Sequence, residues 1–299
     1  MKLKALFLIF ALLMCVLGAN GQEIMCDDRG IEIAVNEPER VVCLYGSYAE
    51  AWILAGGMPA GVTDDAVSER GLELTDDVQI IGTTKEPNLE LVLALEPDLV
   101  IFSLDISQQL SAAEVLESAG VACAGFRVDA WHDYARMMEI FTGLTGRSDL
   151  YEELIPPMQA QIEGIIADAA ENDAPSVLLL RAFSSGVKAK AADNLAGIML
   201  KDLGCVNIAE GDDAILEELS LEAIIAADPD YVFISVMGGD EAAAMAAVDA
   251  QLGSNPAWQA MSAVMNGEVH GLPRELFHYK PNSRWGESYA YLEAILYGE

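Results

Sequence analysis

The densest group of aromatic and cationic side chains lies near the carboxyl end of the chain, in residues 274–285. This segment reads Arg-Glu-Leu-Phe-His-Tyr-Lys-Pro-Asn-Ser-Arg-Trp, in a protein that has only 16 lysines and arginines. Guanidinium groups pair well with carboxylate-like and catecholate-like oxygens, and flat aromatic rings supply the apolar walls of small-molecule sites. The segment therefore predicts contact with an anionic, partly apolar small molecule.

Further candidate contacts follow the strands predicted along the chain. In open α/β sheets, ligands bind beyond the carboxyl ends of the strands, so the polar and aromatic residues that follow each strand are candidates. Arg181, Lys188 and Lys190 add three cations near the same predicted mouth. The candidate ligand-binding residues are Tyr45, Tyr48, Thr84, Arg181, Phe183, Phe277, His278, Tyr279, Lys280, Arg284 and Trp285.

These residues also have a structural explanation. The aromatic rings can belong to the hydrophobic core, and Lys280 and Arg284 can merely offset surface acids. Of the three histidines, His132 is expected on a helix surface, His270 within a strand and packed in the core, and His278 in the candidate segment. An imidazole in that segment is able to ligate an iron or cobalt centre axially.

No catalytic residue is predicted. The sequence has no G-x-G-x-x-G after a strand, no P-loop, no nucleophile elbow and no H-E-x-x-H motif. Its five cysteines lack C-x-x-C spacing and predict neither a metal site nor a disulfide framework. We therefore expect no cofactor and no metal site built from the protein alone.

A fifteen-residue segment that occurs twice indicates which elements position the candidate residues. Residues 89–103 read LELVLALEPDLVIFS and residues 221–235 read LEAIIAADPDYVFIS, with seven identical positions and no gap. Each copy predicts a short amphipathic helix that stops before a proline. An apolar strand follows, of the kind that is buried on both faces in a parallel sheet. Two copies in the two halves of the chain imply two similar α/β lobes.

The rest of both halves alternates between strands and helices, which is typical of mostly parallel sheets. Predicted strands lie at 41–45, 79–82, 121–126, 176–181 and 268–272. Predicted helices lie at 50–55, 112–118, 195–203 and 289–297.

One long helical pattern separates the two halves. It covers residues 148–172, although Pro156 and Pro157 should kink or restart the helix near its beginning. The predicted fold is therefore α/β, with two similar lobes, central mostly parallel sheets, one long rigid joining helix and a ligand cleft between the lobes. We place the N-terminal lobe at 22–147, the connecting helix at 148–173 and the C-terminal lobe at 174–299.

The composition limits the class of partner. A length of 299 residues suits two domains, and a hydrophobic content of 53% indicates a globular protein. The formal net charge of −32 argues against nucleic acid or an anionic membrane surface as the main partner, since both require basic patches. We expect a monomer that binds no nucleic acid.

The amino terminus reads as a secretory signal peptide at residues 1–21. A basic start is followed by an apolar run over 5–18 and by Ala-Asn-Gly before the predicted cut. The apolar run is shorter than the ~20 residues that a spanning helix requires. This predicts secretion across the cytoplasmic membrane to the periplasm or the cell surface. Cys15 and Cys26 both follow a methionine where a lipid-attachment motif requires a small residue, and the sequence does not decide whether a lipid anchor is present.

Several motifs recur in the order of a known family. They are an Arg-Val-Val start to the first strand, Gly82 before Pro87-Asn88-Leu89-Glu90, a Pro-Asp strand in each half, the joining helix and Ser220-Leu221-Glu222. As a set they resemble the helical-backbone class of periplasmic binding proteins, which serves the ABC importers of ferric siderophores, haem and cobalamin. The resemblance covers about residues 38–298. It implies a protein that captures a metal chelate or corrinoid and delivers it to a permease dimer.

The same resemblance assigns a role to one glutamate in each lobe. In that family an acidic residue at the start of the helix before each Pro-Asp strand binds an arginine of the permease, and Glu90 and Glu222 match those positions. A structural explanation exists, because a carboxylate one or two residues after a good N-cap gains ~0.3–1 kcal/mol from the helix dipole. The equivalent placement in both lobes favours docking.

The expected ligand is an iron chelate, either a ferric siderophore or haem. A corrinoid is the alternative within the class, since its uptake uses the same scaffold. A chelatase-like enzyme on a similar two-lobed fold is a second alternative, although the secretory signal counts against it. A third is an exported scavenger of haem or cobamide that never docks with a permease.

Overall fold

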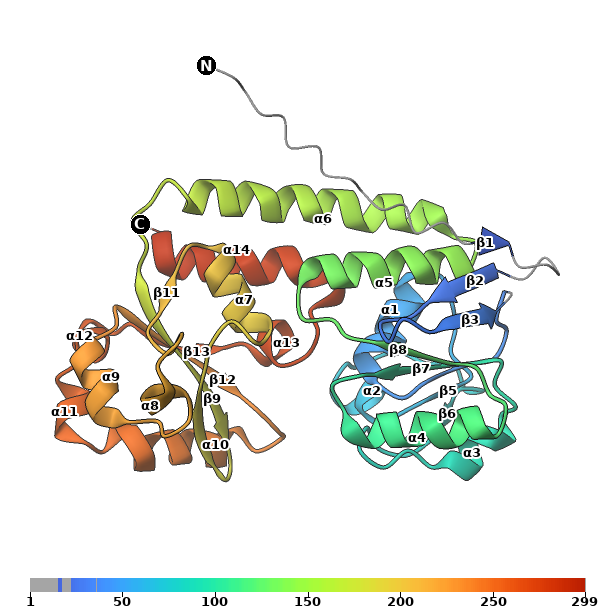
Figure 1. The fold of residues 1–299 in the computed structure, drawn as a ribbon, viewed down its shortest axis with the longest axis horizontal. Coiled ribbons are helices and arrows are strands. Elements are labelled where there is room, and N and C mark those ends of the chain that lie inside the picture. Colours follow the sequence, from blue (N-terminus) through green and yellow to red (C-terminus); the bar gives the residue numbers. More distant parts are fainter. Residues whose placement is uncertain (1–15, 18–22, 36, 299) are drawn as a thin grey trace, which may run out of the picture.

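Two α/β lobes lie side by side beneath a layer of long helices in this computed structural model, which describes residues 16–17, 23–35 and 37–298 (Figure 1). The predicted signal peptide at 1–21 therefore lies outside the described residues, except for the short strand β1 (Val16–Leu17). No helix in the described part of the chain combines the length and the apolar character needed to cross a membrane.

The N-terminal lobe is built on a five-stranded parallel sheet with strand order β6-β5-β4-β7-β8. Its strands are β4 (Val41–Cys43), β5 (Gly61–Val62), β6 (Gln79–Ile80), β7 (Leu99–Ser103) and β8 (Cys123–Phe126). Its helices are α1 (Gly46–Leu54), α2 (Asp65–Ser68), α3 (Leu89–Ala94), α4 (Ser107–Ser118) and α5 (Trp131–Leu144). All five residues of β7 are buried, as expected for a strand with helices on both faces of its sheet.

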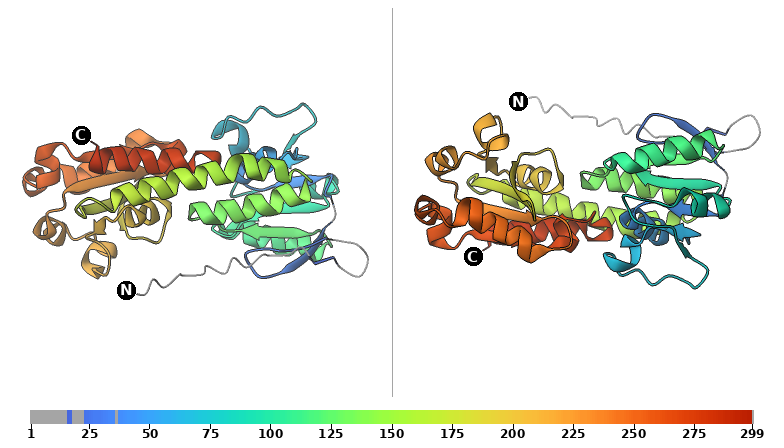
Figure 2. Two further views of the ribbon diagram at one scale, coloured as in Figure 1. Left: turned by 90° about the horizontal axis from the view of Figure 1, so that it is seen from above. Right: turned by 90° about the horizontal axis from the view of Figure 1, so that it is seen from below.

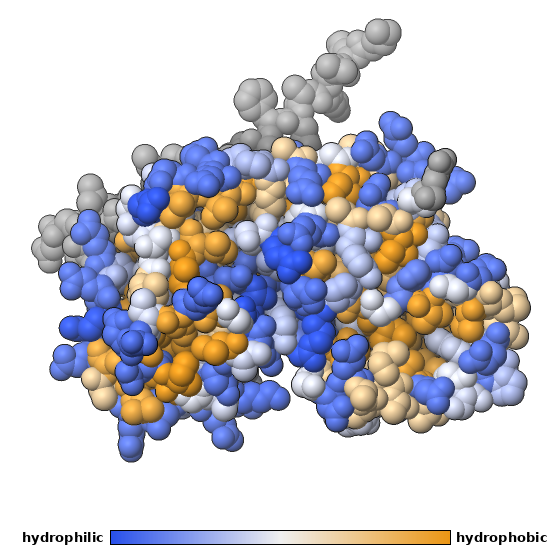
Figure 3. All heavy atoms as spheres, turned by 180° about the vertical axis from the view of Figure 1, so that it is seen from behind, coloured by the Kyte–Doolittle hydropathy of each residue, from blue (hydrophilic) through white to orange (hydrophobic). Residues whose placement is uncertain are grey.

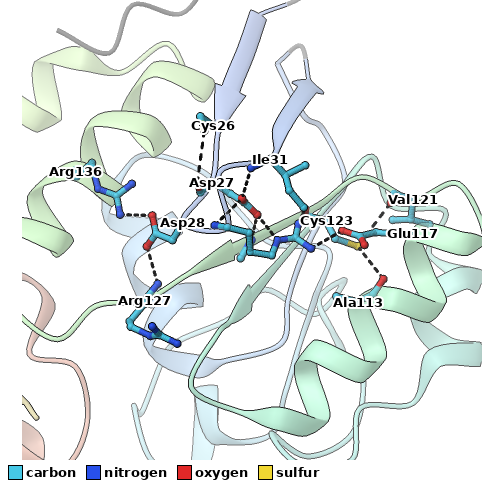
Figure 4. Close-up of polar contacts among 12 residues, drawn as sticks. Cys26, Asp27, Asp28, Ile31, Ala113, Glu117, Val121, Cys123, Arg127 and Arg136 are labelled. Carbon is cyan, nitrogen blue, oxygen red and sulfur yellow. Dashed lines mark hydrogen bonds and ion pairs between the residues drawn. The ribbon is translucent and has the colours of Figure 1, made fainter. Parts of the chain in front are cut away.

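A small antiparallel sheet that the sequence did not predict precedes this lobe. It consists of β1, β2 (Glu23–Cys26) and β3 (Glu32–Val35). The buried Asp27 carboxylate fastens it to the edge strand β8, because it accepts hydrogen bonds from the backbone of Arg29 (2.9 Å) and Ile31 (3.1 Å) within the hairpin and from Gly125 (2.9 Å) in β8 (Figure 4). The Arg29 side chain also pairs with this carboxylate at 2.6 Å.

The C-terminal lobe has a mixed sheet with order β10-β9-β12-β13, and β11 pairs beside β9. Its strands are β9 (Ser176–Phe183), β10 (Gly186–Lys190), β11 (Val206–Asn207), β12 (Tyr231–Val236) and β13 (Val269–Leu272). Its helices are α7 (Leu195–Asp202), α8 (Asp213–Leu216), α9 (Leu221–Ala227), α10 (Glu241–Val248), the π-helix η1 (Asp249–Gly253), α11 (Pro256–Gln259), α12 (Ser262–Asn266), α13 (Arg274–Phe277), the 3-10 helix η2 (Asn282–Arg284) and α14 (Trp285–Tyr297). Only the hairpin β9–β10 is antiparallel in this sheet.

The repeated segment forms the same unit in each lobe, α3 followed by β7 and α9 followed by β12. At the same position of each copy, directly before the proline, the backbone is left-handed, with φ 47° at Glu96 and 42° at Asp228. Because a proline disfavours the right-handed helical conformation in the residue before it, this residue ends the helix and turns the chain into the strand.

The connecting helix α6 (Ser148–Ala169) is continuous through Pro156 and Pro157, so the helix does not restart there as one of the two predicted outcomes required. Both prolines are exposed, and the carbonyl groups four residues earlier, which lose their helical hydrogen bonds, belong to the exposed Glu152 and Glu153. Water can satisfy them there. Helices α5 and α14 pack along α6 (Figures 1 and 2).

One hydrophobic core extends from the N-terminal lobe through α6 to the C-terminal lobe. It includes Trp52 and Phe141 in the first lobe, Ile162 in α6, and Phe233 and Leu292 in the second. The lobes are therefore attached to a shared apolar layer. The predicted fold class, two α/β lobes joined by a long helix, is confirmed.

Candidate ligand-binding cleft

A pocket of about 380 Å³ lies between the two lobes. The molecule is hollowed where the lobes face each other, and hydrophilic side chains gather there (Figure 3). The pocket is lined by Tyr45, Ser103, Asp105, Ile106 and Asp129 from the N-terminal lobe and by Arg181, Asp193, Asn194, Leu195, Met237, Phe277, His278 and Lys280 from the C-terminal lobe.

The lining residues follow the carboxyl ends of strands in both sheets. Tyr45 comes two residues after β4, Ser103 ends β7, and Asp129 follows β8. Arg181 lies near the end of β9 and Met237 follows β12 directly. The strand-end rule therefore places the pocket at the same edge of each sheet.

The buried side chain of Gln109 holds three of these strand ends together. Its amide group donates to the carbonyl of Thr84 at 3.0 Å and to that of Leu44, and its oxygen accepts from the backbone of Ser103 at 2.8 Å. Since the side chain has no exposed area, it acts as an internal brace for the loops of the N-terminal wall. Nothing in the sequence distinguished it from the other glutamines.

Arg181 presents a free hydrogen-bond donor. Its buried Nε has no partner among the described residues. Burial lowers the pKa of this guanidinium, and Asp193 and Asp129 act in the opposite direction. A buried donor without a partner costs free energy. The guanidinium also forms no ion pair with another described residue, so its charge is available to an anionic group of a ligand.

His278 and Met237 lie next to each other in the C-terminal wall, with Nδ1 and Sδ 3.1 Å apart. Burial, followed by the positive charges of the neighbouring Arg274 and Arg181, lowers the pKa of His278 to about 4. The imidazole is therefore neutral at pH 7, the form in which a ring nitrogen can coordinate a metal. No cluster of three or more metal-ligating His, Cys, Asp or Glu side chains occurs among the residues described.

Lys280 connects the two walls. Its Nζ lies 3.3 Å from Asp105 and 3.4 Å from Asp129, both in the other lobe, and its side chain is only 13% exposed. Arg127 also reaches Asp105, at 2.9 Å. The ammonium group is thus already balanced by carboxylates of the protein.

Three of the other four cations predicted near the mouth already have partners within the described part of the protein. Lys190 pairs with Asp193, and Arg284 pairs with Glu287 at 2.7 Å. Arg274 donates to the hydroxyl of Tyr279 at 2.8 Å and to the backbone of Gly238. Lys188 lies exposed on β10. Of the six cations expected to converge, Arg181 and Lys280 line the pocket, and Lys190 pairs with the lining residue Asp193. Contact of the other cations with a ligand stays a prediction.

Five of the eleven predicted contact residues line this pocket: Tyr45, Arg181, Phe277, His278 and Lys280. Tyr48 and Trp285 do not, because neither has any exposed area and both belong to the hydrophobic core. For these two, the structural explanation is the right one.

The remaining four predicted residues also lie outside the lining of the pocket. Phe183 is at the tip of the hairpin β9–β10, and Thr84 sits in a tight turn with its carbonyl bound to Gln109. Tyr279 packs against the guanidinium groups of Arg70 and Arg274, while the guanidinium of Arg284 is taken by its ion pair with a glutamate.

Sequence reasoning missed Asp129, Asp193, Asn194 and Leu195. Asp129 could have been found by applying the strand-end rule to β8 as well. Asn194 is the N-cap of α7, where its side chain accepts from the backbone of Gly197 at 3.3 Å. That capping position carries Asp193 and Leu195 into the pocket beside it.

Glu90 and Glu222 occupy equivalent places in the two lobes. Each lies in the first turn of its helix, after the caps Asn88 and Ser220, whose side chains accept backbone hydrogen bonds. Both glutamates are exposed and neither forms an ion pair within the described part of the molecule. In Figure 1 both helices lie in the lower half of the molecule, away from α6.

A family model described as periplasmic binding protein matches residues 41–276. The chain belongs to the periplasmic binding protein family. The resemblance drawn from the sequence motifs is thereby confirmed.

Relatives of this periplasmic binding protein have names that refer to iron. The chain is 26% identical over 263 residues to the Fe(3+)-citrate-binding protein YfmC of Bacillus subtilis. The matched region covers 86% of this chain and 80% of that protein. The chain is also 23% identical over 245 residues to the probable siderophore-binding lipoprotein YfiY of the same organism. This match covers 78% of this chain and 74% of that protein. The structure of IsdE from Staphylococcus aureus, complexed with heme, superposes with a TM-score of 0.71 at 18% identity. The superposition covers 86% of this chain and 98% of that one. At that identity the superposition shows the fold alone.

Proposed function

We propose that this periplasmic binding protein captures an iron chelate in the pocket between its lobes and delivers it to the permease of an ABC importer. The observation that carries the proposal is the pocket itself, which both lobes line and in which the guanidinium of Arg181 forms no ion pair with another described residue. Tyr45 and Phe277 supply aromatic surface beside it. The names of the two Bacillus relatives favour a ferric siderophore or another ferric chelate.

Haem is the second candidate, and the corrinoid alternative shares its argument. A neutral imidazole and a thioether, His278 and Met237, lie side by side in the C-terminal wall. Imidazole and thioether are both axial ligands that haem iron accepts. Direct ligation would distinguish these metal macrocycles from a siderophore, in which the chelator already fills the coordination sphere of the iron.

The proposal includes place and partner. Secretion across the cytoplasmic membrane would put the protein in the periplasm or at the cell surface, free or lipid-anchored, as a monomer. Glu90 and Glu222 would contact the two subunits of the permease dimer. In this proposal the pocket serves to bind, so no catalytic residue is assigned. A turnover assay with metal and porphyrin would reveal the alternative, a chelatase-like enzyme.

The deciding experiment is a titration of the mature protein with ferric trihydroxamate, ferric dicitrate, haem and cobalamin in turn. Quenching of tryptophan fluorescence reports binding, and the visible spectrum reports axial ligation. We expect saturable 1:1 binding of a ferric chelate without a change in its visible bands. A shifted Soret band that His278→Ala abolishes would instead favour haem, and no binding of any of the four would overturn the proposed ligand class.

A further inference from the structure

The exposed Glu90 of α3 lies between two exposed leucines. Leu91 is 46% exposed and Leu93 is 40% exposed, whereas Val92 is buried. Because an α-helix turns about 100° per residue, the two leucines lie on opposite flanks of α3 while Val92 faces the core. Glu90 then points outward between them. A single exposed leucine carries little information, but here a carboxylate has an apolar side chain on each side.

The repeated segment supplies an internal comparison for this surface. In the C-terminal lobe, Ala223 and Ile225 stand at the two flanking positions of α9. Both pack against the hydrophobic core of that lobe, and the helices α8 and α11 pack against α9. Within the described part of the chain, Glu222 therefore has no large exposed apolar side chain on either flank of its helix.

The chemistry of the surface around Glu90 limits what can cover it. A carboxylate flanked by apolar side chains fits a partner that offers a cation within an apolar patch. An anionic membrane surface does not fit, since the protein carries a formal net charge of −32. A second copy of the same surface does not fit either, because a two-fold contact would bring two Glu90 carboxylates together. The proposed function already pairs Glu90 with a permease subunit, so that subunit is the occupant.

We infer that the two lobes dock unequally and that the N-terminal lobe is the main anchor on the permease. Leu91 and Leu93 pack on an apolar surface around the cation that binds Glu90. Exclusion of water from that ion pair strengthens it, whereas the contact made by Glu222 is ionic, more exposed to water and screened by salt. This inference rests on the proposed function, because it divides between the lobes the docking that the function requires.

Uptake by spheroplasts that lack their own copy of this binding protein tests the anchor. They receive the purified mature protein, loaded with whichever of ferric trihydroxamate, ferric dicitrate, haem and cobalamin it binds most tightly, in radioactive form. The double variant Leu91→Gln, Leu93→Gln keeps residues that favour a helix but removes apolar surface. The protein concentration that gives half-maximal uptake should therefore rise at least about tenfold. The chelate affinity of the double variant should stay within about threefold of the wild-type value, because neither leucine lines the pocket.

Met265→Gln is the matched control, because Met265 is 67% exposed on α12. Ser262, at the start of α12, binds Asp228, which ends α9 on the side away from Glu222. This variant should leave the half-maximal concentration unchanged. Thermal unfolding checks that each variant is folded.

Neutralising one glutamate at a time compares the lobes. Glu90→Gln should raise the half-maximal concentration about tenfold, and Glu222→Gln only about threefold. Equal effects of the two, normal uptake by the folded leucine variant, or a dimer in sedimentation that the leucine variant abolishes would overturn the inference. Uptake that survives the double reversal Glu90→Lys, Glu222→Lys would instead overturn the docking that the proposed function requires.

Discussion

Asn282 and Ser47, which belong to different lobes, are joined by a hydrogen bond of 2.8 Å from the side-chain amide of the asparagine to the backbone carbonyl of the serine. The same amide donates to the carboxylate of Glu50 at 2.6 Å, and Arg70 pairs with that carboxylate. Asn282 has no exposed area and a left-handed backbone, with φ 54°. A single side chain therefore ties η2 of one lobe to α1 of the other.

Replacing this tie should destabilise the protein. Asn282→Ala removes two hydrogen bonds between the lobes, one of them to a carboxylate, so we expect a loss of about 2–3 kcal/mol in the free energy of unfolding. Urea denaturation measures it. Asn282→Gly separates the hydrogen bonds from the backbone, because glycine tolerates the left-handed conformation. Asn266→Ala, at an exposed position in α12, should change stability by less than about 0.5 kcal/mol; an equal loss in this control would remove the special role of Asn282.

The brace at Gln109 should matter for both stability and binding. Gln109→Ala leaves the backbone groups of Ser103, Leu44 and Thr84 without their partner, at a cost of about 2–4 kcal/mol. The loops that line the N-terminal wall would lose their fixed positions, so ligand affinity should fall as well. Denaturation and a titration with the preferred chelate measure the two effects. The neighbouring Gln108 is exposed, and Gln108→Ala should leave both values unchanged.

The N-terminal hairpin should depend on Asp27. Asp27→Ala removes the acceptor for Arg29, Ile31 and Gly125 and leaves a partly buried guanidinium without its closest carboxylate, so we expect a loss of about 3 kcal/mol. Hydrogen exchange should show the effect locally, as faster exchange of the amide of Gly125 in β8. Glu32→Gln alters an exposed acid of the same hairpin; equally fast exchange in that variant would mean that the Asp27 carboxylate does not hold β8.

His278 should contribute to the dependence of stability on pH. The pKa of this imidazole is about 4 in the folded protein, below the value near 6.5 of an unfolded histidine. Between these values the unfolded chain binds more protons than the folded one, so stability falls as pH is lowered from about 6.5 to about 4. His278→Gln should lose less stability over this range than the wild type. The exposed His132 provides the control, because His132→Gln should keep the wild-type profile.

The repeat and the strand-end rule explain how much of this architecture could be predicted from the sequence. Residues 99–102 and 231–234 are apolar without interruption, and a strand covered on both faces suits such a segment. The pocket then had to lie beyond the carboxyl ends of the parallel strands, which is why Tyr45 and Arg181 were found. The short strands β1, β2 and β3 escaped prediction because they have only two to four residues each. Their attachment to β8 depends on Asp27 and Gly125, which are far apart in the sequence.

The side chains of the cleft were harder to predict, because sequence position does not give direction. Tyr48 follows Tyr45 by three residues in the first turn of α1, yet it points into the core and donates to the carbonyl of Phe126 at 3.0 Å. Trp285 ends the aromatic and cationic segment and begins α14, which buries it. The ion pairs of the predicted cations could not be predicted either. Lys190, for example, pairs with Asp193, a residue that the composition does not single out.

Charge reversal at the two exposed glutamates tests the docking role of the repeat. Glu90→Lys and Glu222→Lys place a positive charge where an arginine of the permease would bind, so together they should abolish uptake of the iron chelate by cells. Neither glutamate lines the pocket. The chelate affinity of the purified double variant should therefore stay within about threefold of the wild-type value. Glu86→Lys, at another exposed acid close to α3, is the matched control and should support normal uptake. Uptake that survives the double reversal would leave helix capping as the explanation for both glutamates, and would fit a scavenger that never meets a permease.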